Sequence, residues 1–315
     1  HRGTLRPQLG GHGGHPFGDV DQQVLQGGHL RLFSADAGLD AARGTWIAFV
    51  DSDDEVLPGI WSTLLEGAGD EDAVYFSAEE VREENGQWTR IDSGYFNVDS
   101  QGLRTLTDKD LDSLSMTVWD KLFRRTKLED CALRFPEKIH FEDNVFVLNF
   151  FALNRNVRFE PRRLYRYIRR EGSAMDEAFH QKPGLAFDLI RILDPIRDFW
   201  TQHALLPQNK AIFERICLER LHFALELCLP WERPGIIYAM AERFHAWRFR
   251  PDNPLLRDIA DGTMSIRLGA FVGRNISLLR LKPLQRLLYI GNVHGRKVFC
   301  LLGFIMFSWT KKQHH

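Results

Sequence analysis

The sequence predicts an α/β domain over residues 34–178, followed by a mainly helical region over residues 179–315. Strand and helix signals alternate through the first segment, whereas the second contains long stretches in which apolar residues recur with a helical period. Residues 1–33 hold eight Gly and four His and show almost no apolar periodicity. We expect this N-terminal segment to be disordered or irregular.

Local signals place the individual elements. The apolar run "TWIAFVD" has the length and composition of a buried strand, and Pro58 suits the first turn of the helix that follows. Asn85-Gly86 stands between two strand-like runs and is a hairpin signal. The expected elements, in chain order, are the strand 45–51, the helix 58–68, the hairpin strands 73–81 and 87–91, the helix 142–155, the strand 157–161, and the helices 184–206 and 210–229.

Composition argues against several classes of protein. The net charge of −1 implies no polyelectrolyte partner, so we expect no nucleic-acid binding. The four cysteines are widely separated and form no C-x-x-C pair, which argues against a disulfide framework and a zinc site and fits a reducing compartment. The sequence has neither a secretory signal nor an apolar run of 18 residues, so we expect a cytoplasmic protein with no membrane-spanning helix.

The C-terminal 54 residues differ in charge from the rest of the chain. After Asp261 there are nine Lys or Arg and no acidic residue. Within this tail (residues 262–315), residues 278–288 have an apolar helical face and residues 298–309 form a 12-residue apolar run. The tail is either a helix and strand packed on the rest of the protein or a basic amphipathic segment that binds the anionic inner face of the cell membrane.

Three carboxylates, Asp51, Asp53 and Asp54, follow the expected strand 45–51 directly. One interpretation is a solvated acidic turn, because turns favour Asp. The other is a rigid mount for a divalent cation, whose charge would cancel the repulsion between the carboxylates.

Three further stretches carry residues suited to chemistry. Glu142-Asp143 opens an apolar helix, where acids are stabilised by the helix dipole even without a chemical role. Trp119 and Lys121 stand in "VWDKLFRR" before a basic pair. An arginine cluster in "RRLYRYIRREGSAM" precedes a Gly-Ser turn, and guanidinium groups suit phosphate oxygens, although such clusters are usually solvated.

Together the stretches "AGLDAARGTWIAFVDSDDEVLPG", "VWDKLFRR", "RFPEKIHFEDNVF" and "YRYIRREGSAM" resemble the family 2 inverting glycosyltransferases of the GT-A fold, especially bacterial enzymes of capsule, exopolysaccharide and O-antigen assembly. The resemblance covers about residues 34–176. It implies a GT-A-like, Rossmann-like core and transfer of a sugar from a nucleotide-diphosphate donor to a saccharide or lipid-linked acceptor.

The resemblance also implies roles for individual residues. Asp53 or Asp54 would reach a Mn²⁺ or Mg²⁺ ion, and Asp51 would lie nearer the ribose or the metal shell. Asp143 matches the family's catalytic base, and Glu142 would orient it. The residues matched to donor, diphosphate or acceptor binding are Trp119, Lys121, Arg169, Arg170 and Ser173.

The sequence departs from the family pattern near its start. Strands resembling "VSVIIPVYN" and "DDGSTD", which hold the nucleobase and ribose in the family, are not found in residues 1–33, so we expect an N-terminally incomplete core. Asp120 replaces the usual Asn. The alternatives are an inactive relic or partner subunit of such an enzyme and, more remotely, a haloacid-dehalogenase-type phosphatase, whose Gly-Thr or Gly-Val is replaced here by Asp54-Glu55.

Overall fold

The computed structural model describes residues 24–27, 31–84, 87–91, 93–170, 182–262, 288–293, 296–301 and 304–309.

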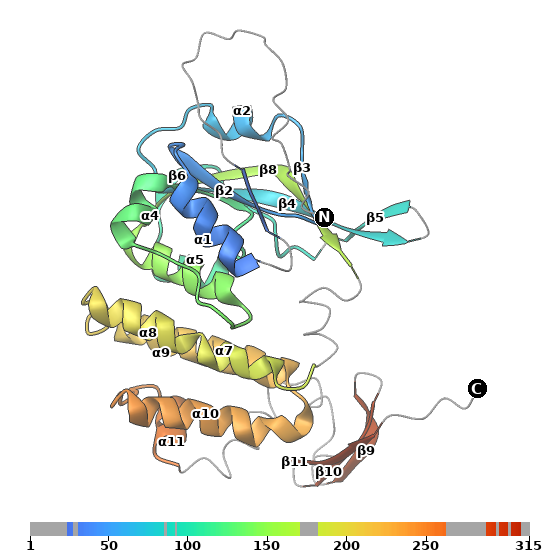
Figure 1. Ribbon diagram of the computed structural model, residues 1–315. Helices are drawn as coiled ribbons and strands as arrows, with labels where there is room; N and C mark the ends of the chain where they lie inside the picture. The colour runs from blue at the N-terminus through green and yellow to red at the C-terminus, as the bar shows by residue number, and fades with distance from the viewer. Residues whose placement is uncertain are drawn as a thin grey trace, which may run out of the picture.

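A mixed eight-stranded sheet forms the N-terminal domain (Figure 1). Its strand order is β1-β2-β7-β4-β8-β3, with β5 paired to β4 and β6 paired to β8. β7 is antiparallel to both β2 and β4, and β4 is parallel to β8, so β2, β4 and β8 all run the same way. The carboxyl ends of β2 and β8 and the start of β7 therefore share one edge of the sheet. The strands are β1 (Val24–Gly27), β2 (Trp46–Asp51), β3 (Glu55–Val56), β4 (Ala73–Glu84), β5 (Gln87–Ile91), β6 (Gly102–Thr105), β7 (Lys121–Arg124) and β8 (Asn156–Arg169).

Strand β2 is buried on both faces, which explains its continuous apolar sequence. Ile47 and Phe49 join one core cluster, whereas Ala48 and Val50 join another on the opposite face. Helix α5 lies over the first face and α2 over the second (Figure 1). The helices of this domain are α1 (Arg31–Ala41), α2 (Ile60–Leu65), α3 (Asp110–Ser113), α4 (Arg125–Cys131) and α5 (Glu142–Leu153).

A helical layer packs on the outer side of α5, so that this helix lies between the sheet and the layer (Figure 1). Phe146 and Phe150 of α5 share one continuous core with Ile196 and Trp200 of α8. The elements of this layer are the 3₁₀ helices η1 (Leu185–Phe187) and η2 (Pro230–Glu232), and the helices α7 (Asp188–Arg191), α8 (Leu193–Gln202), α9 (Lys210–Leu227), α10 (Arg233–Ala246) and α11 (Pro254–Ala260). The predicted α/β core followed by a helical region is confirmed.

Two expectations about the ends of the chain need correction. Within residues 1–33, where no regular structure was expected, β1 pairs with β2 in parallel and α1 begins at Arg31. Residues 288–309, expected to belong to a mainly helical region, instead contain an antiparallel sheet of β9 (Leu288–Val293), β10 (Arg296–Leu301) and β11 (Phe304–Trp309). A short, uniformly apolar run fits a helix and a strand equally well, and Gly303 divides this one. The expected helical face at 278–288 lies almost wholly outside the described residues.

Candidate active site

The acidic turn after β2 is fastened to the end of β8 through Asp54. The Tyr165 O–H donates to Asp54 Oδ2 (2.9 Å), and the Ile168 N–H donates to Asp54 Oδ1 (2.9 Å). The Asp51 N–H donates in turn to Tyr165 Oη (3.1 Å), and the Asp54 N–H closes the turn on the Asp51 carbonyl (3.1 Å). The shape of the turn is therefore set by β8 as well as by β2.

Burial raises the pKa of both Asp54 and Tyr165. It raises the pKa of Asp54 to about 7, helped by the charges of Asp51 and Asp53 and opposed by the two hydrogen bonds. Burial and the charges of Asp54 and Asp51 also raise the pKa of Tyr165 far above its usual value. The tyrosine therefore stays protonated and can serve as a donor to Asp54.

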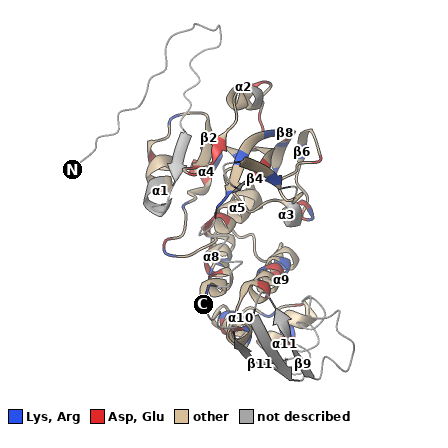
Figure 2. Cartoon of the chain, turned by 90° about the vertical axis from the view of Figure 1, so that its right-hand side faces the viewer, with Lys and Arg blue, Asp and Glu red and all other residues tan. Residues whose placement is uncertain are grey.

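Asp53 occupies the middle of the turn and is half-buried. Its carbonyl oxygen accepts from the Arg170 guanidinium, which extends from the end of β8. Within the described part of the chain, no hydrogen bond or ion pair reaches its carboxylate. Figure 2 shows acidic residues where β2 ends, next to basic residues along β8. Asp53 and Arg170 thus place opposite charges beside each other at the edge of the sheet.

Arg170 differs from the other arginines of this cluster, which have acidic partners or face elsewhere. Arg169 pairs with the buried Glu80 on β4, and Arg166 pairs with Glu55 and Glu79. The structure therefore joins Arg170 to the acidic turn and draws Arg169 to β4. Ser173, the remaining residue expected in this group, lies outside the described residues.

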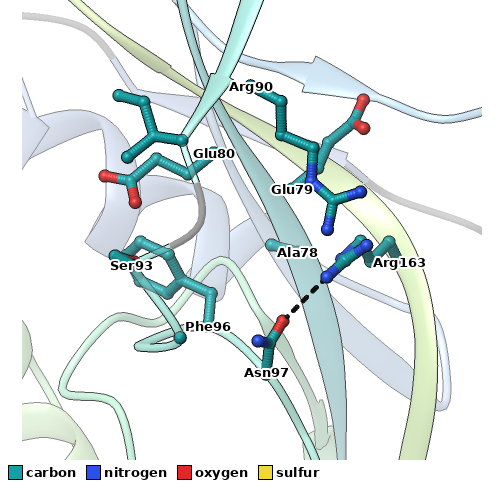
Figure 3. Close-up of a pocket in the computed structure, with 10 residues that line it drawn as sticks. Ala78, Glu79, Glu80, Arg90, Ser93, Phe96, Asn97 and Arg163 are labelled. Atoms are coloured by element: carbon teal, nitrogen blue, oxygen red, sulfur yellow. Dashed lines mark hydrogen bonds between the residues drawn. The ribbon is translucent and has the colours of Figure 1, made fainter.

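The pocket beside β4 is too small to hold a nucleotide sugar. It has a volume of only about 10 Å³ and is lined partly by Glu80, Arg90 and Phe96 (Figure 3), whereas sites for drug-sized ligands usually exceed about 300 Å³. Arg163 points toward Asn97 and donates to its Oδ1 (3.2 Å). This pocket is separate from the acidic turn.

Trp119 lies beneath the acidic turn, in the core. Its ring stacks on the rings of Tyr165 and Tyr167, at centroid distances of 4.6 and 5.5 Å, and only 4% of the residue is exposed. Trp119 was expected to line the cleft. The structure instead places it behind Tyr165, where it fixes the ring whose hydroxyl holds Asp54.

Lys121 is also buried, with none of its surface exposed. Its Nζ donates to Asp120 Oδ1 (2.6 Å), to the Ser115 carbonyl (3.0 Å) and Oγ (2.8 Å), and to the Thr117 carbonyl (2.7 Å). Burial lowers the pKa of Lys121, while the charges of Asp120 and Asp143 act in the opposite direction. Lys121, expected as a cleft residue, thus ties together the segment that leads into β7.

Glu142 and Asp143 form the first turn of α5, and both are half-buried. The ring of Phe146, three residues after Asp143 in α5, packs edge-on against the ring of Phe49 near the end of β2, at a centroid distance of 5.4 Å. The structure therefore packs the helix that bears Asp143 against the strand that leads into the acidic turn, although the two are about 90 residues apart in sequence.

Sequence reasoning missed Tyr165 and Tyr167. Both point toward the core face that holds Trp119, because alternate residues of a strand share a face. The alternation of Tyr and Arg in "LYRYIRR" is the signal that could have revealed them. It was interpreted as an arginine cluster, and the strand was expected to end at residue 161.

The described residues contain neither a preformed metal cluster nor a membrane-spanning helix. No group of three or more His, Cys, Asp or Glu side chains there converges as a metal site. None of the helices that the structure describes is both long and apolar enough to cross a bilayer.

Part of the chain is similar to known proteins. The model of glycosyl transferase family 2 matches residues 34–131. EpsH of Bacillus subtilis (strain 168), named as a glycosyltransferase, is 33% identical over 137 residues, which are 41% of this chain and 39% of EpsH. The uncharacterized glycosyltransferase YibD of Escherichia coli (strain K12) is 29% identical over 142 residues, 41% of this chain and 40% of YibD. The matches thus span about two fifths of the length of each relative.

Among solved structures, S. aureus TarS 1-349 in complex with UDP-GlcNAc has a TM-score of 0.42 and 14% identity, covering 78% of this chain and 74% of that one. The mannosyltransferase PcManGT from Pyrobaculum calidifontis, in complex with GDP-Man and Mn²⁺, has a TM-score of 0.33 and 13% identity, covering 76% and 59%. The matched segment in the sequence contains β2, the acidic turn and β7. Residues 34–131, which form much of the α/β core, are therefore similar to glycosyl transferase family 2.

Proposed function

We propose that this protein transfers a sugar from a nucleotide-diphosphate donor to a saccharide or lipid-linked acceptor, with inversion, in surface polysaccharide synthesis. The observation that supports the proposal is that the fastened acidic turn follows β2, against which α5, the helix that begins with Glu142 and Asp143, packs. A transferase needs a cation-binding mount for the donor and a base for the acceptor within one site.

Asp143 is the proposed base. It would take the proton from the acceptor hydroxyl as the new bond forms at the anomeric carbon and the bond to the diphosphate breaks. Attack in line with the leaving group inverts the configuration at that carbon. Glu142, its neighbour in the first turn of α5, would orient the acceptor or the base.

The residues present fit a Mn²⁺ or Mg²⁺ ion that is bound together with the donor. Such ions take oxygen ligands, and Mg²⁺ often needs only one or two carboxylates besides substrate phosphates and water. Both oxygens of Asp54 already accept hydrogen bonds, so Asp53 is the better placed ligand, with Asp51 near the ribose or metal shell. The ion would neutralise charge developing on the leaving diphosphate, and Arg170 would add a cation beside it.

The decisive experiment uses the full chain, a panel of UDP- and GDP-sugars, and Mn²⁺ or Mg²⁺, with release of nucleoside diphosphate as the readout. Asp143→Asn should lower transfer by more than about 100-fold and leave calorimetric binding of the donor nucleotide intact. Asp53→Ala should weaken metal-dependent nucleotide binding itself. Asp130→Asn, on the exposed face of α4, is the matched control and should change neither.

The results separate the proposal from its rivals. Transfer by Asp143→Asn within about tenfold of the parent would contradict the base assignment. Nucleotide affinity that is equal with and without metal would contradict the metal assignment. Release of phosphate from monoesters would favour a phosphatase, and no turnover of any donor would favour an inactive relative.

A lipid-linked acceptor would place the enzyme at a membrane surface, and we assign that contact to the basic tail (residues 262–315). Each Lys or Arg near an anionic surface contributes about 1 kcal/mol, and the tail has nine with no acid. The full chain should sediment with anionic vesicles at low salt, and about 0.5 M salt should release most of it by screening. A variant lacking residues 262–315 should not sediment. Equal binding to neutral vesicles would show that the charges are not responsible.

A further inference from the structure

The backbone that leads into α5 is strained. Lys138 and Phe141 have φ angles of 58° and 64°, in the left-handed region that non-glycine residues rarely adopt. Such conformations cost about 1–3 kcal/mol each and persist only where surrounding structure enforces them. Residues 138–144, hereafter the base-bearing turn, include both strained positions and Asp143.

The helical layer holds the beginning of this turn through Asp188, the first residue of α7. The His140 backbone N–H donates to Asp188 Oδ2 (3.0 Å), and His140 Nδ1 lies 2.7 Å from the same oxygen. Asp188 is only 5% exposed, and its Oδ1 accepts from Arg191 (2.8 Å). One buried, oriented carboxylate therefore fixes both the backbone and the side chain of the residue before Phe141.

Helix α9 holds the other end of the turn. Arg220 donates to Asn144 Oδ1, and Asn144 is buried at 6% exposure. Phe223, one turn further along α9, meets the Phe141 ring edge-on at a centroid distance of 6.2 Å. Residues 140, 141 and 144 are thus all held by the helical layer, on both sides of Glu142 and Asp143.

We propose that Asp188 and Arg220 are positioning residues, through which the helical layer sets the direction in which Asp143 points. This inference rests on the proposed function of Asp143 as base. A displacement of about 1 Å at a catalytic group can lower the rate about 100-fold. The strained turn would relax to another conformation without these contacts. The helical layer is then part of the catalytic apparatus, although it does not touch the substrate.

The test compares Asp188→Ala with Asp194→Ala in the full chain. Asp194 is the control because its half-buried carboxylate accepts hydrogen bonds from Arg243 and Trp247 of the helical layer and none of these residues belongs to the turn. Asp188→Ala should lower kcat about 10- to 100-fold with donor KM within about twofold of the parent. Asp194→Ala should keep kcat within about threefold even if it lowers thermal stability. Asp188→Asn retains an acceptor for the His140 N–H, so its kcat should be about tenfold higher than that of Asp188→Ala.

A second readout does not depend on activity. Amide hydrogen exchange in residues 138–146 should become faster in Asp188→Ala and stay near the parent rate in Asp194→Ala. Equal kcat in both variants, or a loss that appears in donor KM, would overturn the inference. If the parent protein itself transfers no sugar, the proposed function fails. Unchanged amide hydrogen exchange of residues 138–146 in Asp188→Ala would by itself overturn the proposal that Asp188 positions the turn.

Discussion

Replacing Lys121 with Met should destabilise the protein strongly, because Lys121 and Asp120 form an ion pair with no exposed surface. The substitution keeps the length of the side chain but removes the donor that serves the Asp120 carboxylate, the Ser115 carbonyl and Oγ, and the Thr117 carbonyl. Asp120 then remains buried without its cationic partner and keeps hydrogen bonds from the side chains of Ser115 and Thr117.

The magnitude follows from that uncompensated charge. Breaking a buried ion pair by removing one partner costs about 3–5 kcal/mol, against a total stability of about 5–15 kcal/mol for a typical domain. With a urea m-value of at most about 3 kcal/mol/M, the midpoint of unfolding should fall by more than about 1 M. The assay is urea unfolding of the full chain followed by circular dichroism.

Two companion variants make the reasoning refutable. Lys127→Met breaks a half-exposed pair with Asp72 (3.4 Å) and should cost less than about 1 kcal/mol. Adding Asp120→Asn to Lys121→Met removes the stranded charge and should recover at least about 1 kcal/mol. If Lys121→Met is no more destabilising than Lys127→Met, the pair does not hold the segment before β7, and the buried placement of Lys121 has no energetic consequence.

Two further predictions concern the acidic turn and the base-bearing turn. The folded pKa of Asp54 (about 7) lies above its unfolded value of 3.8, so this group costs stability progressively as pH rises from about 4 to about 7. In EDTA, the parent should therefore lose about 2.5 kcal/mol relative to Asp54→Asn between pH 5 and pH 8 in urea titrations. A pH-independent difference would refute this. Lys138 is exposed and has a φ of 58°, so Lys138→Gly should be at least as stable to heat as the parent. Lys138→Val should lower the free energy of unfolding by about 1 kcal/mol or more. Equal melting temperatures for the two variants would show that the strain is absent.

The sequence predicted the elements whose pattern is local. The run "IAFV" before Asp51 is apolar on both faces of β2, and the helix at Glu142 begins where the acidic pair begins. The expectation of a mainly helical C-terminal region did not anticipate the three-stranded sheet of β9, β10 and β11, because a short apolar run has no diagnostic period. Local pattern therefore gave the class of the fold and most of the core elements.

The contacts that shape the site could not be predicted in the same way. Tyr165 and Asp54 are 111 residues apart, and nothing near either residue indicates the other. The family resemblance implied that Lys121 lines a cleft. Lysine is rarely buried, but four acceptors from residues 115–120 make the full burial of Lys121 possible. Pairings of this kind depend on the register of β4, β7 and β8, which only the folded sheet defines.

The geometry of Asp54 supports the proposed cation site over a merely solvated acidic turn. A merely solvated turn would direct its three carboxylates into water and would carry no penalty. Asp54 is instead buried, and a pKa raised from 3.8 to about 7 corresponds to a cost of about 4 kcal/mol when it is ionised. That cost accompanies two hydrogen bonds that join the end of β2 to β8, with Trp119 stacked behind the tyrosine that supplies one of them. Because the turn is held at this cost, Asp53 has a fixed position at the edge of the sheet, as a rigid mount for a cation requires and a solvated turn does not.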